Sequence, residues 1–296
     1  QAPLLGGVDE RFPGTHVVGS FSVGWRRELD MTLDRHLFSL RTAEAGTSPA
    51  PRVPVFEGKM IHRLRLDWSG WLPATGRWTK EDVCLDPVTA LPISRYEIEA
   101  EDAEARPVAG WRAVVRLIQN ARSSRVLVST LLPPRVRAGN SLGVARLQLH
   151  PGLAAHLGRP VELDRAAESG SLAPEVNAWR IRLHLGLCGW LSSHDPDWAV
   201  RRKIDANLNM FHLAQLPAPN WSRLSETFPP HSVATGDRAD PLPILGGSPF
   251  LLQSIDALTA LVARQGSTGP PFQSLIDDVT FLDDEWSEAA RRALRA

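Results

Sequence analysis

Trp111-Arg-Ala-Val-Val-Arg-Leu-Ile118 and Arg125-Val-Leu-Val-Ser-Thr-Leu-Leu132 are the two stretches that decide the fold class of this chain. Both are short runs rich in Val, Ile and Leu, a composition typical of β-strands. Pro133-Pro134 ends the second run, because proline has no N–H to donate to a neighbouring strand. The sequence therefore predicts two strands in close succession near the middle of the chain.

Working outward from these strands, the pattern becomes mixed. Residues 53–61 form an apolar, strand-like segment interrupted by a proline and a glycine. Residues 179–185 alternate between apolar and polar side chains as a strand does, although the run 183–190 fits a helix equally well. Residues 197–205 predict a helix that carries a basic cluster. Strands and helices together indicate an α+β fold with a mixed sheet.

Two segments rich in Pro, Gly and small residues predict loops, at 42–54 and 229–249. The second marks the expected domain boundary. Before it we expect an α+β domain over residues 1–228. After it we expect a linker and a helical tail over residues 229–296, in which residues 250–264 have helical spacing of apolar side chains.

Composition limits the class of protein. Of the 296 residues, 43% are hydrophobic and 22% charged, which is ordinary for a soluble globular protein. No apolar run approaches the roughly 18 residues of a membrane helix, and no signal peptide is recognisable. Two cysteines are too few for a disulfide framework. We expect a cytoplasmic protein without a membrane partner.

Because the chain starts at Gln1 and its last residues predict an unfinished helix, we expect a segment of a longer protein.

The charge pattern points in two directions. The formal net charge is zero, which argues against a simple polyanion-binding surface. However, 30 of the 33 basic residues are arginines, whose planar fork reads guanine or clamps phosphate with two hydrogen bonds. A GC-rich genome would produce the same bias.

Most catalytic signatures are absent. The sequence contains no Walker A loop, no G-x-G-x-x-G, no G-x-S-x-G and no H-E-x-x-H. A further catalytic signature is the Asn/Asp-Pro-Pro-aromatic tetrapeptide, with which enzymes that methylate adenine hold the flipped base. The nearest matches, Gly269-Pro-Pro-Phe272 and Phe228-Pro-Pro-His231, lack the polar first residue. We expect no catalytic residue and no metal ligand in this chain.

One tripeptide leaves an alternative open. Glu57-Gly58-Lys59 lies in an apolar segment with Asp30 and Asp34 upstream. Nucleases of the PD-(D/E)xK class place an Asp and an E-x-K on adjacent strands, where the carboxylates hold Mg²⁺. A metal-dependent nuclease that uses Glu57 and Lys59 is therefore an alternative hypothesis.

Four segments, taken in order, carry a further pattern. They are Trp25-Arg-Arg-Glu-Leu-Asp-Met-Thr-Leu-Asp-Arg-His-Leu-Phe38, Val55-Phe-Glu-Gly-Lys-Met-Ile-His62, the run from Trp111 to Leu142 that includes Gly139-Asn-Ser-Leu142, and Val200-Arg-Arg-Lys-Ile-Asp-Ala-Asn-Leu-Asn-Met-Phe-His-Leu-Ala-Gln-Leu-Pro-Ala-Pro219. Together they resemble the C-terminal target-recognition regions of large N6-adenine DNA methyltransferases. That family includes type IIG restriction enzymes and phage-growth-limitation methylases of BREX-like and DISARM-like defence islands. The sequence departs from the family after His62 and at Ile204-Asp205.

The resemblance implies a role and its partners. The chain would recognise double-stranded DNA and deliver an adenine to a methyltransferase domain in the same polypeptide or complex. S-adenosylmethionine would bind in that partner domain, so no cofactor is expected in this chain. Other subunits of a defence system are further candidate partners. The remaining alternative is a scaffold of a defence complex that has lost base reading, which scattered arginines would favour.

Candidate DNA contacts are the basic and amide residues inside these motifs. Arg and Lys suit phosphates or guanine, and Asn suits adenine edges or its own turn. Most of the ten tryptophans are expected in the core, with one or two packed on a sugar or an unstacked base. The candidate contacts are Lys59, Arg122, Arg125, Asn140, Arg201, Arg202, Lys203, Asn207 and Asn209.

Overall fold

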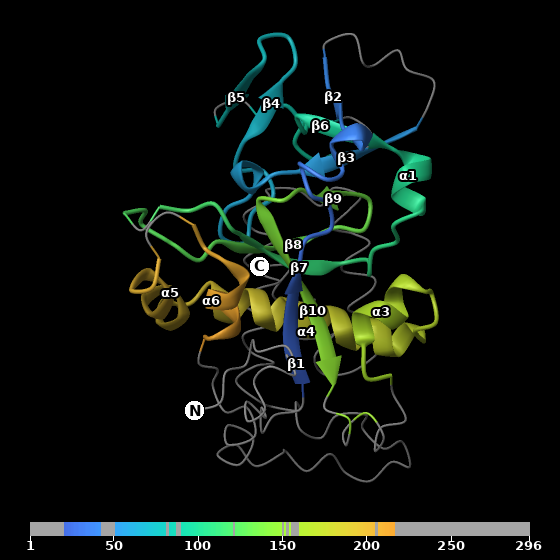
Figure 1. Cartoon of the computed structure of the whole chain (residues 1–296), viewed down its shortest axis with the longest axis vertical. Coiled ribbons are helices and arrows are strands. Elements are labelled where there is room, and N and C mark those ends of the chain that lie inside the picture. The colour runs from blue at the N-terminus through green and yellow to red at the C-terminus, as the bar shows by residue number, and fades with distance from the viewer. Residues whose placement is uncertain are drawn as a thin grey trace, which may run out of the picture.

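The computed structural model shows an α+β protein built on two four-stranded sheets (Figure 1). It describes residues 21–42, 51–80, 83–86, 90–120, 122–149, 160–204 and 207–216, with Pro151 and Ala154. The expected loop 229–249 and the helical tail to residue 296 lie outside these residues.

The first sheet is antiparallel throughout and holds both strands predicted at the centre of the chain. Its order is β1-β10-β7-β8. The strands are β1 (Phe21–Arg26), β10 (Leu142–Leu149), β7 (Arg112–Arg116) and β8 (Ser129–Leu132).

The prediction of a strand at 111–118 is confirmed by β7, but the one at 125–132 is too long. The strand β8 begins only at Ser129. The backbone N–H groups of Val126 and Leu127 donate to the carboxylate of Asp197 instead of to a strand. Here the carboxylate of a helix residue takes the place of a neighbouring strand as the hydrogen-bond acceptor. The apolar composition of the segment does not predict such a partner.

The second sheet is mixed. Its order is β2-β6-β3-β9, with β3 and β9 parallel and the other pairs antiparallel. The strands are β2 (Ser39–Leu40), β6 (Tyr96–Glu99), β3 (Arg52–Phe56) and β9 (Arg137–Ala138). A short α1 (Ala100–Glu104) follows β6, and the 3-10 turn η1 (Arg35–Leu37) precedes β2.

The strand expected over 53–61 and the loop expected over 42–54 both need correction here. The strand β3 starts inside the expected loop and ends at Phe56, and the 3-10 turn η3 (Gly58–Met60) follows. Gly58 explains the break. A Cβ at this position would lie 2.8 Å from the side chain of Arg116, so only glycine allows the backbone this close.

A separate hairpin is formed by β4 (Gly70–Leu72) and β5 (Arg77–Thr79), at the upper left of Figure 1. Leu72 pairs with Arg77, so residues 73–76 form the turn. Gly76 has a φ of +63°, a left-handed conformation that other residues adopt with difficulty.

The expectation of a strand at 179–185 is wrong, because this segment lies within the helix α4 (Pro174–Leu191). The helical alternative for residues 183–190 is the one that the structure adopts. Arg180 and His184, two of the three polar members of the apparent alternation, are as fully buried as Ile181 and Leu183. A helix buried on nearly every side has no apolar stripe, so its sequence lacks the helical period.

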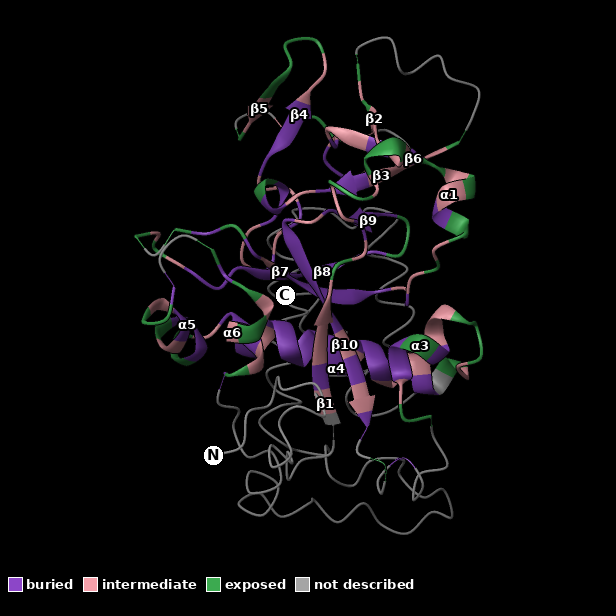
Figure 2. Cartoon of the chain, viewed as in Figure 1, coloured by how far each residue is buried: buried purple, intermediate pink, exposed green. Residues whose placement is uncertain are grey.

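The main core lies between the first sheet and α4, which packs on β7 and β8 (Figure 2). The helix α3 (Leu163–Glu168) packs on β10, and α6 (Met210–Ala214) packs on β1. A smaller cluster of Leu29, Val55, Ile98 and Ala103 forms the core beside the second sheet. Among the helices described, none has the length and apolar character needed to cross a membrane.

Candidate nucleic-acid interface

Most of the predicted DNA contacts come together where the loop after β7 meets α5 (His194–Arg201). Arg122 and Arg125 lie on this loop, and Arg201 is the last residue of the helix. The predicted helix 197–205 therefore starts earlier and ends earlier than expected. Arg202 and Lys203 follow it in a turn. The bonds between loop and helix join residues 69 to 78 positions apart in sequence (Figure 1).

Asp197 is the residue that fastens the loop to the helix. Its Oδ1 accepts the backbone N–H groups of Val126 at 2.6 Å and Leu127 at 2.7 Å. Its Oδ2 lies 3.2 Å from Arg201 Nη2. The side chain is almost fully buried, and hydrogen bonds to a buried carboxylate are among the stronger ones in proteins. The position of the loop is therefore set by α5.

Arg125 and Arg201 complete this junction and use their donors inside the protein. Arg201 donates to the carbonyl oxygens of Ser123 at 2.7 Å and Ser124 at 3.0 Å. Arg125 donates to the carbonyl of Ser193 at 3.1 Å, and its Nη2 lies 3.0 Å from His194 Nε2. Both were predicted as DNA contacts, but the structure gives them a role in shaping the loop.

The residues left facing solvent are the ones suited to a phosphate backbone. Arg122, Arg202 and Lys203 are exposed. The Arg202 guanidinium lies 5.0 Å from the centroid of Trp198, whose side chain is 62% exposed. Residues four apart lie on one face of a helix, so the spacing of Trp198 and Arg202 was a signal that sequence reasoning did not use.

Asn207 and Asn209 extend this surface toward α6. Asn207 is exposed and forms an isolated bridge with Ile118, and Leu208 donates its N–H to Leu117 at 2.7 Å. Asn209 is exposed and precedes the first residue of α6. Burial, followed by the charge of Lys203, lowers the pKa of the neighbouring His212. We call the following set the loop–helix surface: Arg122, Trp198, Arg202, Lys203, Asn207 and Asn209.

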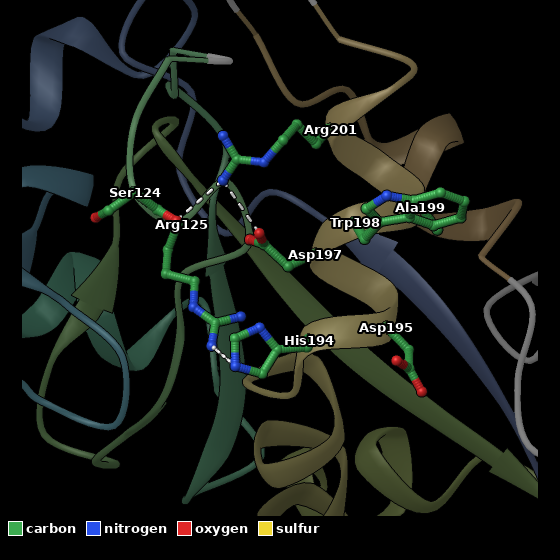
Figure 3. Close-up of a pocket in the computed structure, with 8 residues that line it drawn as sticks. All are labelled: Ser124, Arg125, His194, Asp195, Asp197, Trp198, Ala199 and Arg201. Atoms are coloured by element: carbon green, nitrogen blue, oxygen red, sulfur yellow. Dashed lines mark hydrogen bonds and ion pairs between the residues drawn. The ribbon is translucent and has the colours of Figure 1, made fainter.

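A hollow of about 700 Å³ lies beside this surface, between the loop and α5 (Figure 3). In Figure 3 the side chains of Arg125 and His194 point toward each other, whereas Asp195 points away. The polar groups lining the hollow largely satisfy one another. It is lined by Ser124, Arg125, His194, Asp195, Asp197, Trp198, Ala199 and Arg201.

Lys59 and Asn140 belong to a second region. Lys59 is exposed on η3, with its ammonium 5.7 Å from the ring of Trp78. Asn140 is in the turn before β10, where the next residue, Ser141, accepts the N–H of Gly58 at 2.8 Å. The sequence motifs group these residues with the arginines of the loop, but in the fold they lie on η3 and before β10.

Glu57 is placed differently from what the nuclease hypothesis requires. Its Oε1 accepts a hydrogen bond from Arg95 at 2.8 Å, and burial raises its pKa despite that arginine. Asp30 accepts the N–H groups of Thr32 and Leu33 within its own turn. In the described part of the chain, no three His, Cys, Asp or Glu side chains gather as a metal site would need. These contacts give the nuclease hypothesis no support.

Two buried ionic networks were not anticipated, because buried charges follow no sequence period. One pairs Glu28 with Arg112, with side chains at most 3% exposed. The other joins Asp164 to Arg180 and His184. Each of these side chains is bonded to backbone or to its counterion, so removing one partner would leave a buried charge uncompensated, and neither network exposes a group to a ligand.

No protein-family model matches this chain, and the comparisons with curated proteins and with solved structures likewise return no match.

Proposed function

We propose that this chain is the DNA target-recognition part of an N6-adenine DNA methyltransferase of a cytoplasmic restriction–modification or phage-defence system. The methyl transfer itself, with S-adenosylmethionine, takes place in a partner domain of the same polypeptide or complex. The four motifs that resemble this family motivate the proposal. The geometry supports its DNA-binding half.

The observation that carries the proposal is the assembly of the loop–helix surface from two motifs distant in sequence. Arg122 comes from the third motif, and Arg202, Lys203, Asn207 and Asn209 come from the fourth. Cations and amides on one surface are the groups that hold phosphates and read base edges. The internal bonds of Arg125, Arg201 and Asp197 hold the backbone beneath them, which limits the entropy lost when DNA binds.

The distribution of charge favours DNA binding over the scaffold alternative. Although the whole chain is neutral, residues 21–216 contain 26 of the 33 Lys and Arg and only 21 of the 33 Asp and Glu. This part of the chain therefore has a positive balance. The predicted polyanion partner needs such a balance locally, not over the whole chain.

The direct test measures the affinity of the chain for short DNA duplexes over a range of salt concentrations. We expect weak binding that falls steeply with salt, because phosphate contacts release counterions. Arg122→Ala, Arg202→Ala and Lys203→Ala should each weaken binding, and each lost phosphate contact should lower the salt slope by about 1. Arg165→Ala is the matched control, since Arg165 is an exposed arginine on α3. Equal binding by all four variants would remove the loop–helix surface from the proposal.

The division of labour has its own test. The chain is incubated with S-adenosylmethionine carrying a labelled methyl group and with duplex DNA that contains many different sites. We expect no label in the DNA. Methyl transfer by this chain alone would show that the catalytic site is inside it and would overturn the proposal.

A further inference from the structure

The β4–β5 hairpin and η3 form a second basic surface that the loop–helix surface does not include. Residues 59–80 contain five Lys and Arg but a single acidic residue, Asp67. Arg65 Nε pairs with the Asp67 carboxylate at 2.9 Å. Two of the three lysines of the chain, Lys59 and Lys80, are here, and both are exposed.

Aromatic rings hold these cations in place. The ammonium of Lys80 lies 4.9 Å from the centroid of Trp68, and that of Lys59 lies 5.7 Å from Trp78. His62 stacks on Trp68, with ring centroids 4.1 Å apart. An ammonium over an aromatic face keeps its charge and stays accessible to an anion. The rings thus place the ammonium groups of Lys59 and Lys80 at the exposed surface.

The base of the hairpin is anchored, whereas its turn projects. Trp71 is buried, packs edge-on against Trp78 and donates its indole N–H to the carbonyl of Arg41 at 3.2 Å. Its backbone N–H donates to Ile93 at 2.9 Å. Beyond Leu72, residues 74–77 are all exposed. The turn contains only small residues and proline, and Arg77 comes directly after it.

We infer that the β4–β5 hairpin enters a groove of the DNA duplex, with Arg77 directed at the base edges and Lys59 and Lys80 at the adjacent phosphates. A two-stranded ribbon has the width that the major groove admits. The inference rests on the proposed function, because it takes duplex DNA as the partner. It concerns a different surface, which gives it a separate test.

Arg116 connects the two surfaces within the protein. Its Nη1 donates to the carbonyl of Gly58 in η3 at 3.4 Å, and its Nη2 donates to Gln119 at 2.9 Å, at the start of the loop that carries Arg122. One side chain thus contacts both the segment of Lys59 and the loop of the other surface. A duplex bound at the loop–helix surface would therefore have the hairpin region as a neighbouring contact.

The experiment compares variants of both surfaces in the whole chain, with short duplexes and a single strand of the same sequence as probes. Lys59→Ala with Lys80→Ala should lower the salt slope for duplex by about 2. Arg77→Ala should weaken duplex binding by roughly tenfold and change single-strand binding less, because a single strand has no groove. Arg165→Ala is again the control, and circular dichroism checks that each variant is folded.

Arg77→Lys separates base reading from charge, because lysine keeps the charge but lacks the fork. Duplexes selected from a pool with a randomised centre should show a weaker sequence preference for Arg77→Lys than for the unaltered chain.

The hairpin variants could bind as well as Arg165→Ala while Arg202→Ala still weakens binding. That result would overturn the inference and leave the proposed function standing. The reverse result would support the hairpin and remove the loop–helix surface. No duplex binding by the unaltered chain would overturn both.

Discussion

At the scale of single residues, Arg112 is a fully buried arginine that is bonded through all three of its guanidinium nitrogens. Two of its nitrogens donate to the Glu28 carboxylate, and Nη1 and Nη2 also donate to the carbonyls of Pro133 at 2.8 Å and Val136 at 2.9 Å. Burial would raise the pKa of Glu28, but the charge and hydrogen bonds of Arg112 keep it lower than usual. Glu28 therefore stays ionised in the interior, and Arg112 is its buried counterion.

We predict that Arg112→Met destabilises the protein by about 3–5 kcal/mol, because it leaves a buried carboxylate without its counterion. Urea unfolding measures the change. Glu28→Gln combined with Arg112→Met should cost less than the sum of the two single changes, since the pair is lost together. Arg165→Met is the control, because the exposed pair of Arg165 and Glu162 contributes at most about 1 kcal/mol. Equal costs for Arg112→Met and Arg165→Met would contradict the prediction.

At the scale of elements, the attachment of the 122–127 loop to α5 decides whether the loop–helix surface exists. Asp197→Ala removes the acceptor of two backbone N–H groups, those of Val126 and Leu127, which are buried. We predict a loss of about 2–4 kcal/mol, because unsatisfied buried donors are costly. Hydrogen exchange should quicken first at these two amides. Asp195→Ala is the matched control, as it removes the same charge from the exposed side of the same helix turn. Equal effects would rule out the anchoring role.

The elements also show how far the sequence could predict this fold. The strand β7 was predictable because four of its five residues are buried, which makes its sequence a short run rich in apolar residues. The α4 segment was not, because Arg180 and His184 are buried by ionic partners on other elements, which imitates a strand alternation. The spacing of polar and apolar residues in a sequence predicts which side chains are exposed only when the polar ones face water.

The sequence predicted which residues form the candidate site better than it predicted what each of them does. The motif arginines do gather at one place, but Arg201 turned out to bind carbonyl oxygens of the loop. A sequence does not reveal whether an arginine has backbone acceptors within reach, because those acceptors come from residues 123 and 124, far along the chain. For the same reason Lys59 could not be separated from Arg122 before the fold was known. Nothing in the sequence pointed to Arg77.

At the scale of the whole molecule, one buried network joins both core helices to the first sheet. His184 of α4 donates from Nε2 to Asp164 of α3 at 2.9 Å and accepts the N–H of Ala113 in β7 on Nδ1 at 3.2 Å. Asp164 also accepts from Leu147 in β10 at 2.6 Å and from Arg180 at 2.7 Å. Because Nδ1 accepts and Nε2 donates, the imidazole is neutral in the folded protein.

This network predicts that stability falls on acidification in two steps. Burial lowers the pKa of His184, so below about pH 6.5 the unfolded chain binds a proton that the folded protein does not bind. Stability should then decline by up to about 1.4 kcal/mol per pH unit. Burial would raise the pKa of Asp164, but His184, Arg180 and the Leu147 N–H lower it, so a second decline follows below about pH 4.

His184→Gln tests the first step, because glutamine is neutral at every pH and offers an acceptor oxygen and a donor NH₂ group. Its free energy of unfolding, measured with urea between about pH 7.5 and pH 5, should depend less on pH than that of the unaltered protein. The decline below about pH 4 should persist, since Asp164 remains. An unchanged slope in the first window would show that His184 is not the group that titrates.

Glu28 has one more partner, the backbone N–H of Ala138 at 2.8 Å, and this contact has consequences at a larger distance. Arg112 is in the sheet beside α4, whereas Ala138 is in the sheet toward the hairpin, so a single carboxylate bridges the two halves. The distance between the hairpin and the loop that carries Arg122 is therefore fixed by the fold. A footprint on any bound double helix should then cover the same length whatever its base sequence.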